Sequence, residues 1–453
     1  MFESLMGNKQ QLLRIIRGFF AGSFDKISVT IYNIFSLSIL PSAWGAENYG
    51  QWILLTTIPT AIILGDLGFG NVASNDMTQT YERGQINETK KTLQSSWLLV
   101  SLITLFISII FISCKLLEIK NFGKEYIEFD GNITSIILAI YAIVGVQSII
   151  TNGIYRVSGR YAQGVFFTDS IASVERASIL LLALNGYGFF TVSLIMLIIR
   201  IIGTFILYAN IVRIESWAAV GVSQASWETI MRLRSPALAS LKISASSAIY
   251  LQGLVVSIGH SFAPFAVSVF SPVRTICRLP LQISDLLGRS IVPEVARSYA
   301  DKNIYQIRKI VNLSALFSLI CTVPFCIILT LFGNSIINFM TSNKIHVHDN
   351  SIFFFVSVAS VFSALTSSAG MALQAMNRHA SYANATIFIY CLLALVPFFI
   401  WTNDFSGLKI VSVALAFADF ILALLVWHRL RKELDAVMGR LVENSQIGGC
   451  PPE

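Results

Sequence analysis

The feature that most constrains this chain is a row of charged residues inside an apolar stretch, 271–300. Arg274 and Arg278 are four positions apart, so they lie on one face of a helix, and Asp285 and Arg289 fall within about 60° of that face. Because a charge that faces lipid costs about 3 kcal/mol or more, this face must meet a protein interior or a water-filled cavity. The stretch is therefore predicted to be a membrane-spanning helix that carries charge into the bilayer.

Pro280 lies near the middle of the same stretch and predicts a break or kink, because proline cannot donate the helical hydrogen bond. Broken helices with polar groups near the membrane midplane are a usual place for a transporter to bind its substrate. The rest of the chain fits this setting, since 55% of its 453 residues are hydrophobic, only 13% are charged and the mean hydropathy is +0.68. A soluble protein carries about 25% charged residues, so the sequence indicates a polytopic membrane protein.

Twelve apolar segments are each near the length of about 20 residues that crosses a bilayer. The predicted fold class is therefore an all-α polytopic membrane protein with about twelve transmembrane helices. The second and eighth segments are long and are expected to bend or protrude. No cleavable signal peptide is expected, because charged residues interrupt the first segment. The predicted spans are 16–40, 50–79, 93–116, 132–154, 164–184, 187–210, 236–258, 263–296, 308–331, 351–375, 382–401 and 408–428.

Positive charge predicts the orientation. With twelve spans both termini lie on one side, and that side carries 20 of the 32 Lys and Arg residues against 5 on the other. Cytoplasmic loops carry such an excess, so both termini are predicted to be cytoplasmic. The net charge of +7 is then mainly an orientation signal, and no nucleic-acid partner is expected.

The two halves of the chain repeat each other. Asp66 and its surroundings align with Asp285 at an offset of 219 residues, and Lys26 in the first span is echoed by Lys242 in the seventh. Six spans is an even number, so the copies have the same orientation, as in several transporter families. The linker between them holds two tryptophans among polar residues and fits either an amphipathic helix on the membrane surface or an ordinary mobile linker. The predicted parts are an N-terminal six-helix lobe at 1–210, a cytoplasmic linker at 211–235, a C-terminal six-helix lobe at 236–428 and a cytoplasmic tail at 429–453.

Ionisable residues inside spans usually mark a pathway, although they can also pair structurally between helices. Residues that recur in equivalent spans favour the cavity, whereas the others fit structural pairing equally well. The candidate substrate-binding residues are Lys26, Lys242, Arg274, Arg278 and Arg289. The candidate ion-coupling residues are Asp66 and Asp285, because a carboxyl group in a partly dry cavity can exchange a proton or bind Na⁺. The secondary intramembrane charges are Asp25, Asp169, Arg176, Arg200 and Asp419, with Glu175 beside them in the fifth span.

Other patterns are discounted. Gly65, Gly68 and Gly70 have a spacing found in dinucleotide-binding loops, but no strand precedes them, and close helix packing is the preferred interpretation. The six cysteines have no metal-ligand spacing, and His346 and His348 lie in a predicted outer loop. No metal site, nucleophile–base arrangement or nucleotide-binding loop is predicted, so the chain is not expected to be an enzyme.

Two segments resemble a known family. The loop GAENYGQW at 45–52 and the second-span sequence LGDLGFGNVASNDM at 64–77 resemble the Wzx-type polysaccharide-repeat flippases. These proteins belong to the multidrug/oligosaccharidyl-lipid/polysaccharide (MOP) exporter superfamily. The resemblance is clearest over the first two spans, and twelve spans depart from the fourteen of the lipid II flippases.

The resemblance implies a V-shaped, MATE-like transporter of two six-helix lobes in the bacterial inner membrane. Its expected function is to flip an undecaprenyl-pyrophosphate-linked oligosaccharide, such as an O-antigen repeat unit for lipopolysaccharide, by alternating access. It implies no cofactor, coupling to H⁺ or Na⁺, and membrane lipid, a polysaccharide polymerase and chain-length machinery as partners. Two alternatives stay open. A cation-coupled drug exporter of the same superfamily should have an acidic cavity, and a non-transporting membrane scaffold would not need the charged stripe.

Overall fold

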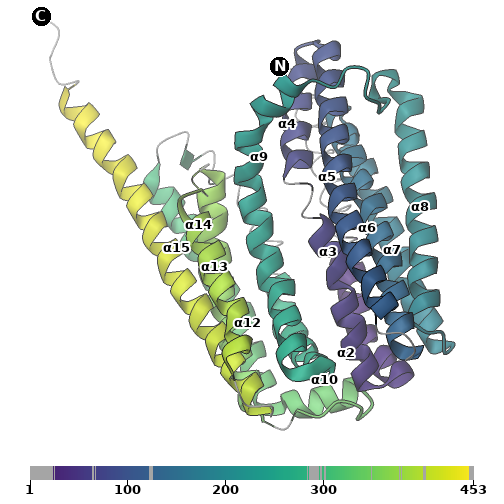
Figure 1. Cartoon of the computed structure of the whole chain (residues 1–453). Coiled ribbons are helices and arrows are strands. Elements are labelled where there is room, and N and C mark those ends of the chain that lie inside the picture. The colour runs from purple at the N-terminus through teal and green to yellow at the C-terminus, as the bar shows by residue number, and fades with distance from the viewer. Residues whose placement is uncertain are drawn as a thin grey trace, which may run out of the picture. The chain divides into compact units, whose positions relative to one another are not determined.

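The chain forms two compact units in a computed structural model, one ending at Ala248 and one beginning at Ile249 (Figure 1). The described residues are mostly helical, with short turns and loops between the helices, and they contain no strand. The structure describes residues 24–447 except 25, 64–65, 67, 122–125, 283, 285–294, 296–297, 300–302, 348, 377, 379 and 401–404.

The first unit is a group of long helices joined by short turns. Its core includes Met77, Leu93, Tyr155 and Leu207, which come from four different helices. The Tyr155 hydroxyl donates to the Leu207 carbonyl oxygen at 3.0 Å, so the polar end of this buried ring is also satisfied. The elements are a helix at Lys26–Trp44, α2 (Ala46–Leu55), α3 (Thr57–Ile63), α4 (Phe69–Glu82), α5 (Ile86–Asn121), α6 (Tyr126–Val157), α7 (Tyr161–Leu184), α8 (Phe189–Ile214), the 3₁₀ turn η2 (Ser216–Ala218) and α9 (Trp227–Ala248).

The second unit has a separate core. Val311, Leu373, Val426 and Leu430 pack together there, from three long helices. The C-terminal helix continues well beyond the predicted last span, and the Arg308 guanidinium lies 2.6 Å from the Asp435 carboxylate on that extension. The elements are the π turn η3 (Ile249–Gly253), α10 (Leu254–Cys277), α12 (Ile304–Met340), α13 (Ser351–Ala375), α14 (Ala380–Leu395), the 3₁₀ turn η4 (Val396–Phe399) and α15 (Phe405–Ile447).

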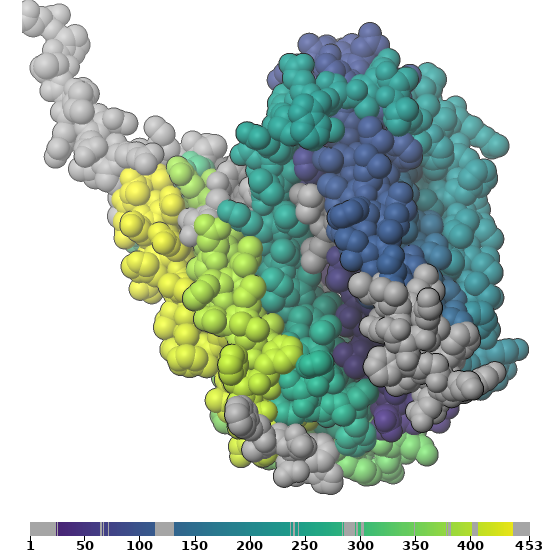
Figure 2. All heavy atoms as spheres, viewed as in Figure 1, coloured from purple at the N-terminus to yellow at the C-terminus, as the bar shows by residue number. Residues whose placement is uncertain are grey.

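Nine helices of the described chain are long and apolar enough to cross a membrane. Their exposed faces are apolar, as on α12, where Leu313, Leu316, Ile320 and Ile327 recur at helical spacing and are each more than half exposed. An exposed apolar stripe of this length is suited to lipid contact, and Figure 2 shows how side chains of long helices form the surface of each unit. The charged α7 and the interrupted α2–α4 region correspond to two further predicted spans, and the predicted seventh and eighth spans share the segment Ser244–Cys277, which breaks at Ala263. The prediction of an all-α polytopic fold is confirmed.

The second predicted span is three helices rather than one bent helix. The chain turns at Thr56 between α2 and α3, and Gly68 precedes α4 with a φ of 74°. This left-handed conformation is one that glycine adopts at little cost. Gly68 therefore serves a turn before α4, and a role for it in helix packing stays a prediction.

Both ends of the predicted linker belong to α8 and α9, and the segment between these helices, 215–226, is docked on the first unit with only the short turn η2 in it. Gln94 of α5 binds it three times: it donates to the Ala219 carbonyl oxygen and accepts from the Ser223 hydroxyl and, at 2.7 Å, from the Gln224 N–H. Trp217 is buried, with its ring centroid 5.5 Å from that of Tyr81. α9 packs on α4 and α5, so the first unit includes residues that the sequence analysis assigned to the second lobe.

Candidate functional site

The charged stretch that opened the sequence analysis is broken, as Pro280 predicted. α10 ends at Cys277, and Arg278 follows as its C-cap in a turn. A second break lies within α10 at Ala263, which has a φ of 70° and precedes Pro264. Asp285 and Arg289 lie outside the described residues, so the structure describes the stripe only through its first two arginines.

Arg274 is buried and binds backbone. Its Nη2 donates to the Leu251 carbonyl oxygen at 2.7 Å, and its Nη1 donates to that of Tyr250 at 3.4 Å. Both carbonyls belong to the π turn η3. The guanidinium carbon also lies 5.6 Å from the centroid of the Phe270 ring. Arg274 thus has a structural role in holding the turn, and its contact with a substrate stays a prediction.

Arg278 belongs to a polar cluster built around a buried acid. Its Nη1 donates to the Tyr250 hydroxyl at 2.9 Å, and that hydroxyl donates to Oδ2 of Asp419 at 3.0 Å. Ser363 donates to the same carboxylate oxygen at 2.9 Å, and Tyr390 donates to Oδ1 at 3.3 Å. Asp419 is 1% exposed, so three hydroxyl groups replace water around it. Asp419 therefore lies within the same hydrogen-bonded network as a candidate substrate-binding arginine.

A second polar cluster lies in the first unit and is built differently. Glu175 of α7 and Arg200 of α8 form a direct ion pair, and both also hydrogen-bond to the Tyr141 hydroxyl of α6. The Arg200 guanidinium lies 4.8 Å from the centroid of the Tyr141 ring. Glu175 is buried, and Arg200 is partly buried. Arg200 therefore fits the structural-pairing interpretation, which the sequence left open.

The remaining fifth-span charges face the first helix. Ser173 and Arg176 both hydrogen-bond to the Ser28 hydroxyl, at 2.7 and 3.1 Å. Asp169 is half-buried on the same face of α7, one turn before Ser173. Asp25, the last of the secondary charges, lies outside the described residues.

Lys26 lies on a polar face of the first helix. Ile27, Ile31 and Ile34 form an exposed apolar stripe, whereas Lys26, Thr30 and Asn33 are half-buried and lie about 100° further around the helix. The Lys26 side chain is therefore directed away from the lipid-facing stripe.

Lys242 lies on α9 and is exposed. Within the described chain, no acidic residue lies within ion-pair distance of Lys26 or Lys242. Among the candidate substrate-binding residues, these two lysines therefore form no ion pair that the described residues show.

Asp66 is almost completely buried beside the start of α4. Its Oδ1 accepts a hydrogen bond from the Gly70 N–H at 2.8 Å. Gly70 is packed closely, since a Cβ there would lie 2.9 Å from Ile149 and 3.1 Å from that oxygen. Asp66 therefore satisfies a free N–H of the α4 N-terminus, and its role in ion coupling stays a prediction.

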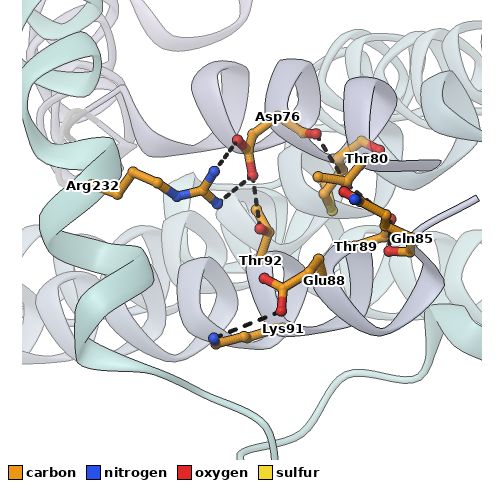
Figure 3. Close-up of polar contacts among 9 residues, drawn as sticks. Asp76, Thr80, Gln85, Glu88, Thr89, Lys91, Thr92 and Arg232 are labelled. Carbon is orange, nitrogen blue, oxygen red and sulfur yellow. Dashed lines mark hydrogen bonds and ion pairs between the residues drawn. The ribbon is translucent and has the colours of Figure 1, made fainter. Parts of the chain in front are cut away.

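An additional acid, Asp76, fastens α9 to α4. Arg232 donates to both carboxylate oxygens of Asp76, at 2.9 and 2.8 Å, and the Thr92 hydroxyl donates to Oδ2 at 2.8 Å (Figure 3). This two-pronged arrangement is the preferred geometry of an Arg–carboxylate pair. Asp76 lies within the second-span sequence LGDLGFGNVASNDM, but its charge alone did not single it out.

Solved structures similar to this chain are transporters. An inward-facing multidrug resistance MATE family transporter of the MOP superfamily matches with a TM-score of 0.75 at 16% identity, over 90% of this chain and 95% of that one. The chain has the MATE fold. An outward-facing structure of such a transporter matches with a TM-score of 0.63 at 16% identity, over 94% of this chain and 96% of that one.

A MOP superfamily transporter from Pyrococcus furiosus, for which reverse polarity of the binding pocket suggests a different function, matches equally well. Its TM-score is 0.63 at 14% identity, over 94% of this chain and 96% of that one. No protein-family model and no curated protein matches the chain. The predicted MATE-like fold is therefore confirmed.

Sequence reasoning missed the tyrosines of this MATE-fold chain. Tyr141, Tyr250 and Tyr390 each contact a buried carboxylate, but they carry no formal charge. Their only sequence signal is a polar ring in a span, and tyrosine is also common at membrane interfaces. The charges could be found from the sequence, whereas the hydroxyls that satisfy them could not.

Proposed function

We propose that this chain is a transporter that flips a lipid-linked oligosaccharide with a pyrophosphate head by alternating access. The observation that carries the proposal is the pair of lysines, Lys26 and Lys242, which lie in predicted spans and have no described acidic partner. A cation at that depth is costly unless an anion joins it, and a pyrophosphate group supplies several negative charges. Arg278 adds a planar group able to bind two phosphate oxygens.

The acids support the same choice of substrate. Glu175 is paired with Arg200, and Asp419 accepts hydrogen bonds from three hydroxyls. Glu175 is neutralised by its base and Asp419 is enclosed by hydroxyl groups at 1% exposure, so neither carboxylate is open to a cationic drug. The Pyrococcus furiosus transporter, with its reverse-polarity pocket, supports the idea that pocket charge can differ between proteins of this fold.

Cation-coupled drug export is the second candidate, because the similar structures include multidrug resistance transporters. The two functions separate in proteoliposomes that carry the purified protein. We expect it to flip a fluorescent undecaprenyl-pyrophosphate oligosaccharide and not to move a cationic dye. Transport of the dye without flipping of the lipid would favour the exporter and contradict the proposal.

The lysines give the sharper test. Lys26→Ala with Lys242→Ala should lower the flipping rate about tenfold or more, since each removed charge costs the order of 1 kcal/mol of anion binding. Lys344→Ala is the matched control, because Lys344 is exposed in a loop between two spans. Equal rates in the double variant and the control would contradict the assignment. Loss of one surface glycan on gene deletion would identify the sugar.

Coupling to H⁺ or Na⁺ is part of the proposal, with Asp66 and Asp285 as its candidate residues. Flipping should respond to an imposed pH or Na⁺ gradient. Asp66→Asn should abolish that response if Asp66 couples the ion. A lower flipping rate with an unchanged gradient dependence would contradict a coupling role and show that Asp66 only caps the N-terminus of α4. An inner-membrane location with a polymerase as partner completes the proposal, and co-purification from bacterial inner membranes tests it.

A further inference from the structure

A π turn lies where the chain passes from one unit to the other. The units divide between Ala248 and Ile249, and η3 occupies Ile249–Gly253. No loop separates α9, η3 and α10, so the connection between the units is helical. A π turn interrupts the regular hydrogen-bond ladder and is one of the few identifiable causes of helix bending. The junction thus lies at an irregular helical turn, where bending has an identifiable cause.

Two arginines from the end of α10 hold this turn. Arg274 binds its main chain, at the carbonyl oxygens of Leu251 (2.7 Å) and Tyr250 (3.4 Å). Arg278 binds its side chain, at the Tyr250 hydroxyl, with the guanidinium carbon 4.9 Å from the ring centroid. The Tyr250 ring also lies 4.5 Å from that of Tyr390. The turn is therefore fixed through both its backbone and its one buried aromatic ring.

The burial of Arg274 argues for a specific role. Its side chain is almost completely inside the unit, and among the described residues no acid forms an ion pair with it. A buried cation compensated by carbonyl dipoles and an aromatic ring, without an acid, is costly, and an apolar side chain of similar size is often the more stable choice. Overall stability alone would not favour an arginine here, whereas holding two carbonyl oxygens of a turn requires a forked donor.

We propose that the π turn Ile249–Gly253 is the hinge between the two units, that Arg274 is the positioning residue that holds it, and that Arg278 links it to the anionic ligand. The last part rests on the proposed function. A pyrophosphate group at Arg278 competes with the Tyr250 hydroxyl for the same N–H donors. Binding then releases the Tyr250 side chain and loosens the turn, because the ligand favours the state in which Arg278 is available.

Hydrogen exchange of the full-length protein in nanodiscs tests the hinge directly. In Arg274→Gln, amides of the segment 249–256 should exchange about tenfold faster than in the unmodified protein, because the turn loses charge-assisted hydrogen bonds. Arg274→Lys should fall between the two, since an ammonium group cannot span both carbonyls. Arg200→Lys is the control, because it alters another intramembrane guanidinium that does not contact the turn.

Exchange within twofold of the unmodified protein in both Arg274 variants would overturn the hinge. Should Arg274→Gln fail to fold, Arg274→Lys alone decides, by the same comparison.

Farnesyl pyrophosphate tests the ligand link. It should raise exchange of the segment 249–256 about threefold in the unmodified protein and have no effect in Tyr250→Phe, which lacks the competing hydroxyl. A protein that flips the lipid-linked oligosaccharide but shows no such response would overturn the link and leave the proposed function standing. A protein that neither flips the lipid-linked oligosaccharide nor responds to farnesyl pyrophosphate would overturn both the proposed function and the ligand link. The Arg274 variants test the hinge whichever result is obtained.

Discussion

The two units solve the problem of a buried acid in opposite ways. In the first, Glu175 meets a full positive charge, Arg200, through a direct ion pair. In the second, Asp419 meets the hydroxyl groups of Tyr250, Ser363 and Tyr390. Arg200 and Asp419 are 219 residues apart, which is the offset of the internal repeat. One position of the repeat therefore carries a base in the first copy and an acid in the second.

This difference suggests a division of labour. A closed ion pair neutralises itself and needs no third group, so it serves packing between α7 and α8. A carboxylate held by hydroxyls, one of which is shared with Arg278, responds to whatever Arg278 binds. The second cluster is thus the one that the proposed function would connect to the substrate. Four predictions test this contrast, in order of decreasing effect.

Breaking the ion pair of the first unit should have the largest effect on stability. Arg200→Met leaves Glu175 buried without its base and should cost about 3–5 kcal/mol of unfolding free energy. Adding Glu175→Leu should recover most of this loss, because no unpaired charge then remains. Denaturant unfolding in detergent measures both. Arg308→Gln is the control, since its partly exposed pair with Asp435 should contribute at most about 1 kcal/mol. If the double variant is as unstable as Arg200→Met, the claim that Glu175 and Arg200 neutralise each other without a third group is contradicted.

Removing the charge of Asp419 should cost less, because its partners are neutral hydroxyls. Asp419→Asn keeps one carbonyl oxygen as an acceptor, so we expect a loss of about 1–3 kcal/mol. The same unfolding measurement applies. A cost equal to that of Arg200→Met would show that Asp419 depends on a full charge in the same way as Glu175, and the contrast between the units would fail.

Loss of a tyrosine hydroxyl should cost more stability in the second unit than in the first. Tyr250→Phe removes the hydroxyl that bridges Arg278 and Asp419 and should cost about 1–2 kcal/mol. Tyr141→Phe leaves the direct bond between Glu175 and Arg200 in place and should cost about 0.5 kcal/mol. Melting of the two variants side by side gives the comparison. The reverse order would show that Tyr141 is the more important bridge.

An exposed acid supplies the smallest effect and a baseline for the buried ones. Hydrogen bonding by Ser351, with a smaller contribution from Lys409, lowers the pKa of Asp349. A carboxyl group whose pKa is lower in the folded state than in the unfolded state stabilises the folded state at any pH above the unfolded-state pKa. This stabilisation is lost as the pH falls through the folded-state pKa. Between pH 4 and pH 2, Asp349→Asn should therefore lose about 1 °C less in melting temperature than the unmodified protein. An identical acid response would contradict the contribution of Asp349.

The helices followed from the sequence more closely than the site. Hydropathy placed the tenth span at 351–375, which are the bounds of α13, and Pro280 predicted the break after Cys277. Those features depend on local composition and on the missing proline N–H. The π turn, the docked linker and the hydroxyls around Asp419 depend on which side chains meet across helices. A charge in a span is visible in a sequence, but whether it pairs with a base, a hydroxyl or a backbone carbonyl is decided by that packing.

Flipping by neutralised variants tests the division of labour most directly. The rate of undecaprenyl-pyrophosphate oligosaccharide flipping is measured in proteoliposomes with equal amounts of folded protein. Glu175→Leu with Arg200→Met, which removes the cluster of the first unit as a pair, should retain the rate of the unmodified protein within about twofold. Asp419→Asn and Tyr250→Phe, which disturb the cluster that contains Arg278, should each lower it about tenfold. Full activity in the second-unit variants together with loss of activity in the first-unit pair would contradict the account.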